Sequence, residues 1–554
     1  MVRRAQAVPE DPGLPGVTPA TREETFPVAL ASVLLGFVSF LVCFGRGYLL
    51  LYGDAVAHLA IARRILDSRN PGLAQLGGVW LPLPHLLMLP FIGNMQWWQN
   101  GLAGAWPSLA CYILGVIGLY RLARRMLTPA WAFAATAFYA LNPNLLYLAT
   151  TAMTEPLFLA ELIWLTLLTL ECVAAVRAAV THPERAGAVA RRLVGIGLLT
   201  LGAVYTRYDG WILGAAIWCV LAWQLGRAPA VLRRVAPAFG LYTLLAVAGP
   251  VSWLAYNQHF FHDPLDFMRG PYSAAAIDKR TTPPGAHHYR GWHNPAWALL
   301  FYTRTAQVDA AFWETGFVLM AGALAGLVLL VRQGVARAAL LLWVPLPFYV
   351  YSVAYGSVPI FIPQLYPHSY YNARYGMEML PALALFGAFA LAGLAVWLTP
   401  RQPLAAKLLQ PVALLVVALN TVGMMYTVPL VLKEGMVNST TRMAFETAIA
   451  HELESFPQGV PILMYNSEHV GALQQAGIPL HQTLNEGDYT TWKPALDAPA
   501  QHAAYVIAIA GDPVSQAVAA HPEGLTELAV LCTTGQPCAR VYQSNVFVPS
   551  PPAR

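Results

Sequence analysis

Long apolar stretches, separated by short basic segments, constrain the fold of this chain most. Most of the stretches are close to the about 20 residues that a helix needs to cross a hydrocarbon core about 30 Å thick, whereas the fifth and sixth are shorter. They fall at Phe26–Gly45, Trp106–Leu122, Ala130–Leu148, Pro156–Val176, Leu193–Tyr205, Trp211–Leu225, Pro237–Tyr256, Phe312–Val331, Ala338–Tyr355, Met377–Leu398 and Pro411–Leu432. The pattern predicts a polytopic α-helical membrane protein with about 11 transmembrane helices.

The composition excludes other classes. Only 11% of the 554 residues are charged and 57% are hydrophobic, whereas a soluble domain carries about 25% charged residues. A soluble fold of this composition would expose too much apolar surface, and disorder needs the opposite composition. The net charge of +5 is small and spread out, so we expect no nucleic-acid partner.

Basic residues set an orientation, because Lys and Arg are retained in short cytoplasmic segments. Six alternate segments carry them: Arg3, Arg4 and Arg22; Arg121, Arg124 and Arg125; Arg177, Arg185, Arg191 and Arg192; Arg227, Arg233 and Arg234; Arg332 and Arg337; Arg401 and Lys407. We therefore expect a multi-pass protein of the plasma (inner) membrane, with a cytoplasmic N-terminus and an extracytoplasmic C-terminus. Its first span reads as an uncleaved anchor.

Three domains are expected along the chain. Residues 1–25 hold four prolines among polar residues and predict a disordered cytoplasmic tail. Residues 26–432 form the transmembrane domain. Residues 433–554 alternate short apolar runs with helical stretches, which indicates a small α/β domain outside the membrane. Cys532 and Cys538 flank a turn-like segment there, and because that compartment is oxidising we predict a disulfide.

The first outer loop carries two candidate interfacial helices. In Gly53-Asp54-Ala-Val-Ala-His58, Asp54 and His58 are four residues apart and share a helix face. The segment Trp80-Leu-Pro-Leu-Pro-His85 starts a second apolar helix that is too short to span. Two structural roles stay open: Asp54 as a helix cap, and His85 as part of a membrane-surface anchor.

Three further polar clusters map to the same outer face. They are Thr154-Glu155-Pro156, Arg207-Tyr208-Asp209-Gly210, and the segment Pro367–Tyr375 with Tyr371 and Arg374. Ionisable residues at membrane depth are costly and usually functional, and arginine beside aromatic rings suits a phosphate group. The alternatives are mutual neutralisation of Arg207 and Asp209, and a plain interfacial aromatic belt.

The order of these clusters resembles the GT-C superfamily of integral-membrane glycosyltransferases, especially its protein O-mannosyltransferase-like and aminoarabinose transferase-like branches. The resemblance covers about the first 400 residues and includes Ala373-Arg374-Tyr375 with Pro381 following. It implies a polyprenyl-phosphate-linked sugar donor in the membrane lipid and transfer of the sugar to a hydroxyl on the outer side. It also implies that Asp54 is catalytic.

Roles follow from the resemblance and from the residue types. Asp54 would be the general base on the acceptor hydroxyl, and the acidic lipid phosphate leaves without a general acid. Arg374, with Arg207, would stabilise that phosphate. Glu155 and Asp209 would orient the acceptor, the sugar or Arg207. The residues expected to line the sugar pocket are His58, His85, Tyr208 and Tyr371.

The sequence departs from related motifs. Many relatives carry two acids where Asp54 is followed by Ala55, and Trp97-Trp98 is followed by Gln99 in place of an acid. An oligosaccharyltransferase is therefore disfavoured. We expect no required cofactor and no metal ligands, while a role for a divalent metal stays open.

The acceptor and the class of protein stay open at the level of sequence. The acceptor is a protein, a lipid or a glycan. The rival classes are a membrane transporter that uses Glu161 and Glu171 as a proton path, and a non-catalytic lipid-binding protein of the same fold.

Overall fold

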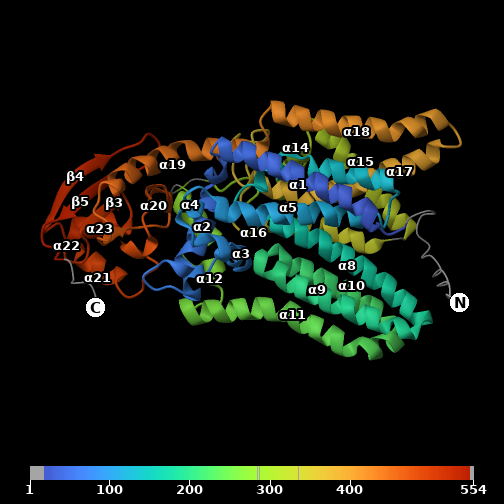
Figure 1. The fold of residues 1–554 in the computed structure, drawn as a ribbon, viewed down its shortest axis with the longest axis horizontal. Coiled ribbons are helices and arrows are strands. Elements are labelled where there is room, and N and C mark those ends of the chain that lie inside the picture. The colour runs from blue at the N-terminus through green and yellow to red at the C-terminus, as the bar shows by residue number, and fades with distance from the viewer. Residues whose placement is uncertain (1–17, 283–284, 286, 335, 549–554) are drawn as a thin grey trace. The chain divides into compact units, whose positions relative to one another are not determined.

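The computed structural model describes residues 18–282, 285, 287–334 and 336–548 (Figure 1). The chain divides into two compact units, and each is built from several stretches of sequence. Unit 1 comprises Met1–Phe40, Leu109–Ala149 and Thr154–Leu432; unit 2 comprises Leu41–Ser108, Thr150–Met153 and Lys433–Arg554. The first outer loop thus groups with the C-terminal segment.

The named elements of unit 1 are all helices, joined by turns and loops. Two of its helices, α1 and α5, extend into unit 2. The helices are α1 (Arg22–Gly45), α5 (Leu102–Ala123), α6 (Pro129–Ala140), α7 (Pro143–Leu148), α8 (Glu155–Thr181), η3 (Pro183–Arg185), α9 (Ala186–Thr206), α10 (Asp209–Gly226), α11 (Pro229–Phe261), α12 (Asp266–Arg269), α13 (Ala274–Thr281), α14 (Pro295–Ala310), α15 (Thr315–Gln333), η4 (Arg337–Trp343), α16 (Pro345–Tyr355), η5 (Ala373–Met379), α17 (Leu380–Leu398) and α18 (Pro403–Tyr426).

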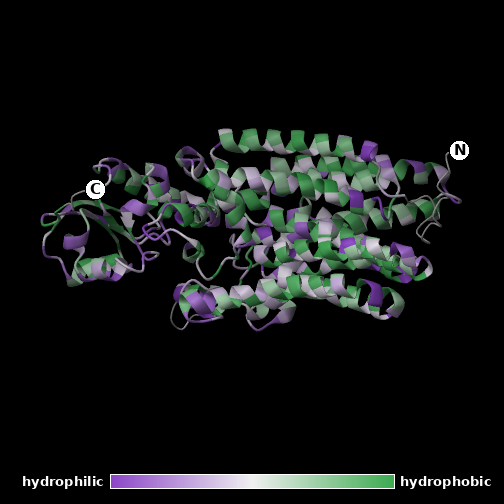
Figure 2. Cartoon of the chain, turned by 60° about the horizontal axis from the view of Figure 1, so that its bottom comes forward, coloured by the Kyte–Doolittle hydropathy of each residue, from purple (hydrophilic) through white to green (hydrophobic). Residues whose placement is uncertain are grey.

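Two groups of helices make up most of unit 1. Helix α9 packs against α8, α10 and α11, and α17 packs against α6, α15 and α18 (Figure 1). Helices α15 and α17 come close because Gly326 faces the backbone of Phe386, where an added Cβ would lie 2.0 Å from the carbonyl oxygen. Figure 2 shows mostly hydrophobic residues along the long helices, as expected where lipid replaces water.

Within the described residues, ten helical segments are long and apolar enough to cross a membrane. The expected span Ala130–Leu148 is missing from this set because two shorter helices, α6 and α7, occupy it. The break lies at Asn142, whose side chain accepts hydrogen bonds from the backbone N–H groups of Asn144 and Leu145. Pro143 follows it, and the residue before a proline is disfavoured in a helix.

Two expected boundaries also differ from the structure. The span expected at Leu193–Tyr205 is longer, because α9 begins at Ala186. Of the predicted disordered tail 1–25, residues 1–17 lie outside the described residues, and α1 already begins at Arg22. Glu24 shares a hydrogen-bonded turn with Thr21, whose hydroxyl accepts from the Glu24 backbone N–H at 3.2 Å. This capping arrangement starts the helix earlier than its apolar residues do.

Unit 2 combines short helices with a sheet. Its further elements, beginning with the helix α19 that enters it from unit 1, are α19 (Leu430–Glu454), η1 (Tyr48–Leu50), α2 (Gly53–Leu66), η2 (Leu73–Leu76), α3 (Leu83–Ile92), α4 (Met95–Gln99), β1 (Ile462–Met464), α20 (Val470–Ala476), η6 (Leu480–Gln482), β2 (Thr483–Leu484), α21 (Trp492–Asp497), α22 (Pro499–His502), β3 (Tyr505–Ile509), α23 (Pro513–Ala520), β4 (Leu525–Leu531) and β5 (Ala539–Ser544).

The described strands of unit 2 form one mixed five-stranded sheet in the order β2-β1-β3-β5-β4. Strand β1 pairs in parallel with β2 and β3, whereas β5 is antiparallel to both β3 and β4. The core beneath the sheet includes Leu463, Val506 and Val514, all buried. The α/β fold expected for the C-terminal segment is confirmed.

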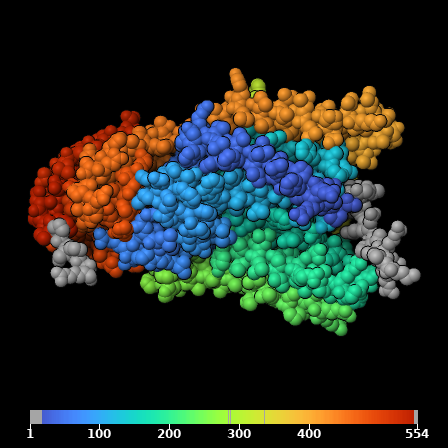
Figure 3. All heavy atoms as spheres, in the orientation of Figure 1, coloured from blue at the N-terminus to red at the C-terminus, as the bar shows by residue number. Residues whose placement is uncertain are grey.

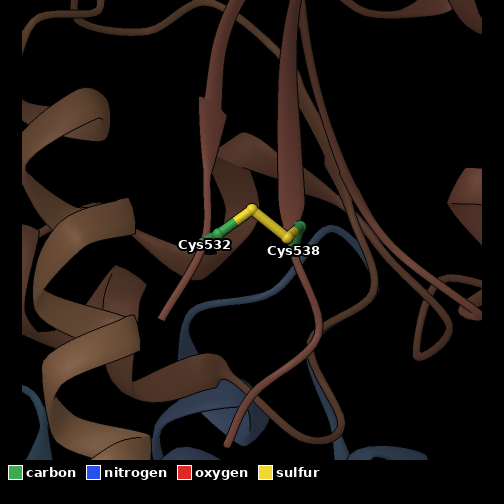
Figure 4. The surroundings of a disulfide bond; sticks show 2 residues. All are labelled: Cys532 and Cys538. Atoms are coloured by element: carbon green, nitrogen blue, oxygen red, sulfur yellow. A yellow bond between two sulfur atoms is a disulfide. The ribbon is translucent and has the colours of Figure 1, made fainter. Parts of the chain in front are cut away.

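A disulfide bond joins Cys532 and Cys538 at the end of the β4–β5 hairpin (Figure 4). The two residues follow β4 and precede β5, so the bond closes the connection between the last two strands. The other four described cysteines form no disulfide bond: Cys43, Cys111, Cys172 and Cys219.

The first outer loop and the C-terminal segment pack together inside unit 2 (Figure 3). Gln474 of α20 donates to the Trp98 carbonyl at 2.6 Å, and Gln99 donates to the Gln475 carbonyl at 3.1 Å. Arg69 donates to the Thr483 carbonyl at 3.2 Å across 414 residues of sequence. These contacts make the outer loop a structural part of the C-terminal domain.

Candidate functional site

A buried cluster of charged side chains lies in unit 1 around Arg207. Its guanidinium group contacts three carboxylates: Glu155 at 3.4 Å, Asp209 at 3.3 Å and Glu378 at 3.1 Å. The Arg207 side chain is 15% exposed, and each of the three carboxylate side chains is at most 1% exposed. The positive charge of Arg207 is therefore balanced by carboxylates within unit 1.

Arg374 joins the same cluster through Glu155. The Arg374 Nε lies 3.1 Å from Glu155 Oε1, the oxygen that also contacts Arg207. The Arg374 guanidinium carbon lies 4.9 Å from the centre of the Tyr375 ring, and that of Arg207 lies 5.2 Å from it. One carboxylate and one ring thus contact both arginines.

Local sequence explains how each cluster residue reaches this position. Glu155 begins α8 and Asp209 begins α10, where the positive end of a helix favours a carboxylate. Arg207 directly follows the last residue of α9 and lies two residues before Asp209, and Arg374 lies in η5. These residues come from three separate parts of the sequence and meet at this cluster.

Glu378 and Tyr349 belong to the cluster but were not singled out from the sequence. The Tyr349 hydroxyl donates to Glu378 Oε1 at 2.6 Å and accepts from Arg207 Nη2 at 2.6 Å. Glu378 lies four residues after Arg374, so this spacing was a usable signal. Hydropathy alone does not mark Glu378, because it lies among apolar residues in a predicted membrane span.

The two tyrosines expected in a sugar pocket have different surroundings. The Tyr208 ring stacks on Phe267 with centroids 4.8 Å apart, and its hydroxyl accepts from Trp253 Nε1 at 3.2 Å. Tyr371 is 41% exposed and forms an isolated antiparallel bridge with Phe361. Tyr208 therefore packs in an aromatic cluster, whereas Tyr371 lies at the surface of unit 1.

In unit 2, Asp54 lies in the first turn of α2 and is half-buried. The cap residue of this helix is Tyr52, so Asp54 is not the cap. It lies instead among the backbone N–H groups of the first turn, which favour a negative charge. The expected helix, with Asp54 and His58 on one face, is present.

His58 and His85 are brought together from the two helices of the first outer loop. Their ring nitrogens His58 Nδ1 and His85 Nε2 lie 2.9 Å apart, and both residues are buried. The Trp80 ring lies 4.4 Å from the His58 ring. Burial, then the neighbouring His58 and the Arg64 charge, lowers the pKa of His85 well below its usual value, so His85 is neutral at pH 7.

Arg442 fixes the chain just before α2. Its Nη2 donates to the carbonyl oxygens of Leu50 at 3.0 Å and Leu51 at 3.1 Å, and its Nη1 lies 2.6 Å from Glu446 Oε2. A residue of the C-terminal segment thus holds the backbone that leads into Asp54.

Asp67, at the other end of α2, is also bound by the C-terminal segment. It forms ion pairs with Arg63, at 2.7 Å, and with His481. Burial alone would raise the pKa of Asp67, but the hydrogen bond from His481 and the charge of Arg63 bring it below its usual value. The chain before α2 is therefore held by hydrogen bonds from Arg442, and the end of α2 by the ion pairs of Asp67.

Within the residues that the structure describes, no three or more His, Cys, Asp or Glu side chains are grouped so that they could hold a metal ion. We therefore assign no metal ligands. The acidic clusters have arginine or histidine partners instead.

Comparisons with known proteins identify the fold. No model of a protein family matches the sequence. No curated protein matches it either. Among solved structures, ArnT (aminoarabinose transferase) from Cupriavidus metallidurans bound to undecaprenyl phosphate is similar, with 14% identity, 96% of this chain and 100% of that chain covered, and a TM-score of 0.57.

Two more solved structures are similar. The apo state of the same ArnT has 15% identity, covers 93% of this chain and 99% of that chain, and has a TM-score of 0.51. The second is the archaeal oligosaccharyltransferase AglB from Archaeoglobus fulgidus, in complex with an inhibitory peptide and a dolichol-phosphate. It has 11% identity, covers 88% of this chain and 69% of that chain, and has a TM-score of 0.45.

The chain has the fold of ArnT, a GT-C superfamily membrane glycosyltransferase. The fold class expected from the resemblance is confirmed. Together with its apolar helices, this fold makes the chain an integral, multi-pass membrane protein.

Proposed function

We propose that this chain is a glycosyltransferase that moves a sugar from a polyprenyl-phosphate donor to an acceptor hydroxyl on the outer side of the membrane. The observation that carries the proposal is the similarity to ArnT bound to undecaprenyl phosphate, which extends over 96% of the chain. The N-terminus would be cytoplasmic and the C-terminal domain extracytoplasmic, as the basic segments indicate.

Arg374 is the proposed ligand of the donor phosphate, because guanidinium groups match phosphate oxygens in charge and geometry. Arg207 was expected to share this role. Its three carboxylate contacts support a different one, in which Arg207 holds Glu155 and Asp209 in position. Glu155 in turn orients Arg374.

Asp54 is the proposed general base, which takes the proton of the acceptor hydroxyl as that oxygen attacks the anomeric carbon. The bond from that carbon to the phosphate oxygen breaks, and the polyprenyl phosphate leaves as an anion. The half-buried carboxylate in the first turn of a fixed helix supports this role, because a base must be accessible and held in place. His58, His85 and Tyr371 are proposed to contact the sugar or the acceptor.

A transporter has less support. Glu171, which a transporter would use as a proton carrier, forms ion pairs with both Arg125 and Arg192. A non-catalytic lipid-binding protein would bind the donor and release no polyprenyl phosphate. Measuring the reaction therefore distinguishes it from a glycosyltransferase.

The test uses the purified full-length chain in proteoliposomes with radiolabelled polyprenyl-phosphate hexoses and pentoses. We expect release of free polyprenyl phosphate and label on an acceptor. Asp54→Asn removes the base and should slow transfer by about 10²–10⁴-fold. The matched control is Asp497→Asn, an exposed aspartate of the same unit, which should transfer at the wild-type rate.

Each outcome decides between the classes. If no donor releases polyprenyl phosphate and the proteoliposomes accumulate a solute when a pH gradient is applied, the protein is a transporter. Donor binding without release would identify a lipid-binding protein. Transfer at the wild-type rate by Asp54→Asn would disprove the role of Asp54 while leaving the glycosyltransferase class intact.

A further inference from the structure

A cavity of about 600 Å³ lies in unit 1, lined by residues other than those of the charged cluster around Arg207. Its volume falls in the range of roughly 300–1,000 Å³ that is usual for small-molecule sites. It is bounded by the end of α5, the C-terminal part of α8, η3 and the start of α9. The lining residues are Arg125, Glu171, Ala174, Ala175, Arg177, Ala178, Thr181, His182, Arg185, Ala188 and Arg192.

Helix periodicity explains why there is room for a ligand. Residues 171, 174, 175 and 178 recur along one face of α8, and residues 188 and 192 recur along α9. Four of the lining residues on these helices are alanines, so their faces approach the cavity with methyl groups only. A larger side chain at Ala178 would fill part of this space.

The charge of the lining is strongly positive. Four arginines face a single carboxylate, that of Glu171. Glu171 forms ion pairs with Arg125 and, at 3.8 Å, with Arg192, which fixes these two guanidinium groups in the wall. Arg177 and Arg185 add two further positive charges at the same cavity.

Guanidinium groups recognise phosphate through paired N–H donors. Basic pockets between membrane helices on the cytoplasmic side bind anionic lipid head groups, and all four arginines belong to segments predicted to be cytoplasmic. We propose that this cavity binds a phosphate-bearing anion, either the head group of an anionic lipid or a soluble phosphate ester. The site is independent of the proposed transferase chemistry.

Binding is measured on the purified full-length chain in a neutral detergent by isothermal titration calorimetry. The probes are short-chain phosphatidylglycerol, phosphatidylcholine of the same chain length, and glycerol phosphate. We expect phosphatidylglycerol to bind with one site per chain. In Arg177→Gln and Arg185→Gln its affinity should fall roughly fivefold for each arginine removed, the size expected of one basic side chain near an anionic surface.

A second variant and a control separate the cavity from general surface charge. Ala178→Leu keeps every charge and narrows the cavity, so it should also weaken binding. Arg332→Gln removes an exposed arginine of another predicted cytoplasmic segment and should leave binding unchanged.

The probes distinguish the two sources of phosphate. Binding of phosphatidylglycerol alone supports a lipid head group, and equal binding of glycerol phosphate with the same variant response supports a soluble ester. The proposal is overturned if neither probe binds, if phosphatidylcholine binds equally well, or if Arg332→Gln weakens binding as much as the cavity variants do.

Discussion

Glu155 and Arg374 lie 219 residues apart in the sequence and are joined by a contact of 3.1 Å. The same Glu155 oxygen contacts Arg207 at 3.4 Å. One buried carboxylate therefore connects the start of α8, the end of α9 and the short helix η5. The geometry of Arg374 depends on this carboxylate.

Replacement of Glu155 by alanine should be strongly destabilising, because it leaves two buried guanidinium groups without their shared partner. We expect the free energy of unfolding to fall by about 3–5 kcal/mol, measured by thermal and denaturant unfolding in detergent. The control is Glu314→Ala, which breaks the more exposed pair with Arg304 and should cost about 1 kcal/mol or less. Equal losses in both variants would contradict a structural role for the buried cluster.

Arg374 and Arg207 should respond differently to substitution by lysine. At Arg374, a lysine keeps the charge but loses the paired donors, so KM for the donor should rise about tenfold, with a smaller change in kcat. At Arg207 the main effect should be on stability, because one ammonium group replaces a guanidinium group that contacts three carboxylates. Steady-state kinetics and the melting temperature of each variant check this, and a raised donor KM in the Arg207 variant alone would reverse the assignment.

Arg442 is a positioning residue for Asp54, because it holds the carbonyl groups just before α2. We expect Arg442→Ala to lower kcat by about tenfold or more with little change in donor KM, since misplacement of a catalytic group slows the chemical step. Arg540→Ala is the matched control, because Arg540 pairs with Glu527 at the surface of the same unit. A kcat equal to that of the control would show that the Arg442 contacts do not act on Asp54.

His469 should make unit 2 sensitive to acid. Burial, with the nearby charge of Arg442, lowers the pKa of His469 to about 4 from 6.5. As the pH falls, the His469 ring is therefore protonated in the unfolded chain before it is protonated in the folded one. Its contribution to the free energy of unfolding is fully present above about pH 6.5 and is lost as the pH drops towards 4, by about 3 kcal/mol in total. Melting temperatures between pH 7 and 4, compared between the wild type and a variant without this histidine, measure this loss.

The variant His469→Phe isolates this contribution. It keeps an aromatic ring against Phe445, whose centroid lies 5.0 Å away, and it cannot titrate. The loss of melting temperature on acidification should be smaller in this variant. The pH dependence that remains comes from His85, whose pKa is also lowered, and from Glu446, whose pKa burial raises to about 7 and which acts in the opposite direction. An unchanged slope would rule out His469 as the source.

The Cys532–Cys538 bond should be detectable by non-reducing peptide mapping as one linked pair. The two positions are six apart in the sequence, so a short loop is closed and reduction should cost about 2 kcal/mol. We expect the double variant Cys532→Ser/Cys538→Ser to melt earlier than the oxidised chain and to lose its response to reductant. Two free thiols in the map would contradict the structure.

Much of the fold could be predicted from local sequence. Apolar length predicts the spans, and the spacing of Asp54 and His58 predicts a shared helix face. The break at Asn142 was missed because hydropathy does not register a capping side chain followed by a proline. The grouping of the outer loop with the C-terminal segment depends on contacts such as Arg69 with Thr483, which have no local signal.

The candidate site was only partly predictable for the same reason. Glu155, Arg207, Asp209 and Arg374 stand out as charges in apolar surroundings. Their contact with one another depends on how α8, α9 and η5 pack, which spacing along the chain does not specify. Glu378 is also a charged residue in apolar surroundings, but it lies inside a predicted membrane span.

The three separate stretches that form unit 2 have a consequence for how the protein is made. The loop that carries Asp54 emerges from the ribosome more than 300 residues before the segment that holds it in place. During synthesis this loop lacks its contacts with the C-terminal segment until the membrane helices, which precede that segment in the sequence, have been made. The proposed catalytic base would therefore be assembled last, so a partly made chain could not begin to transfer sugar.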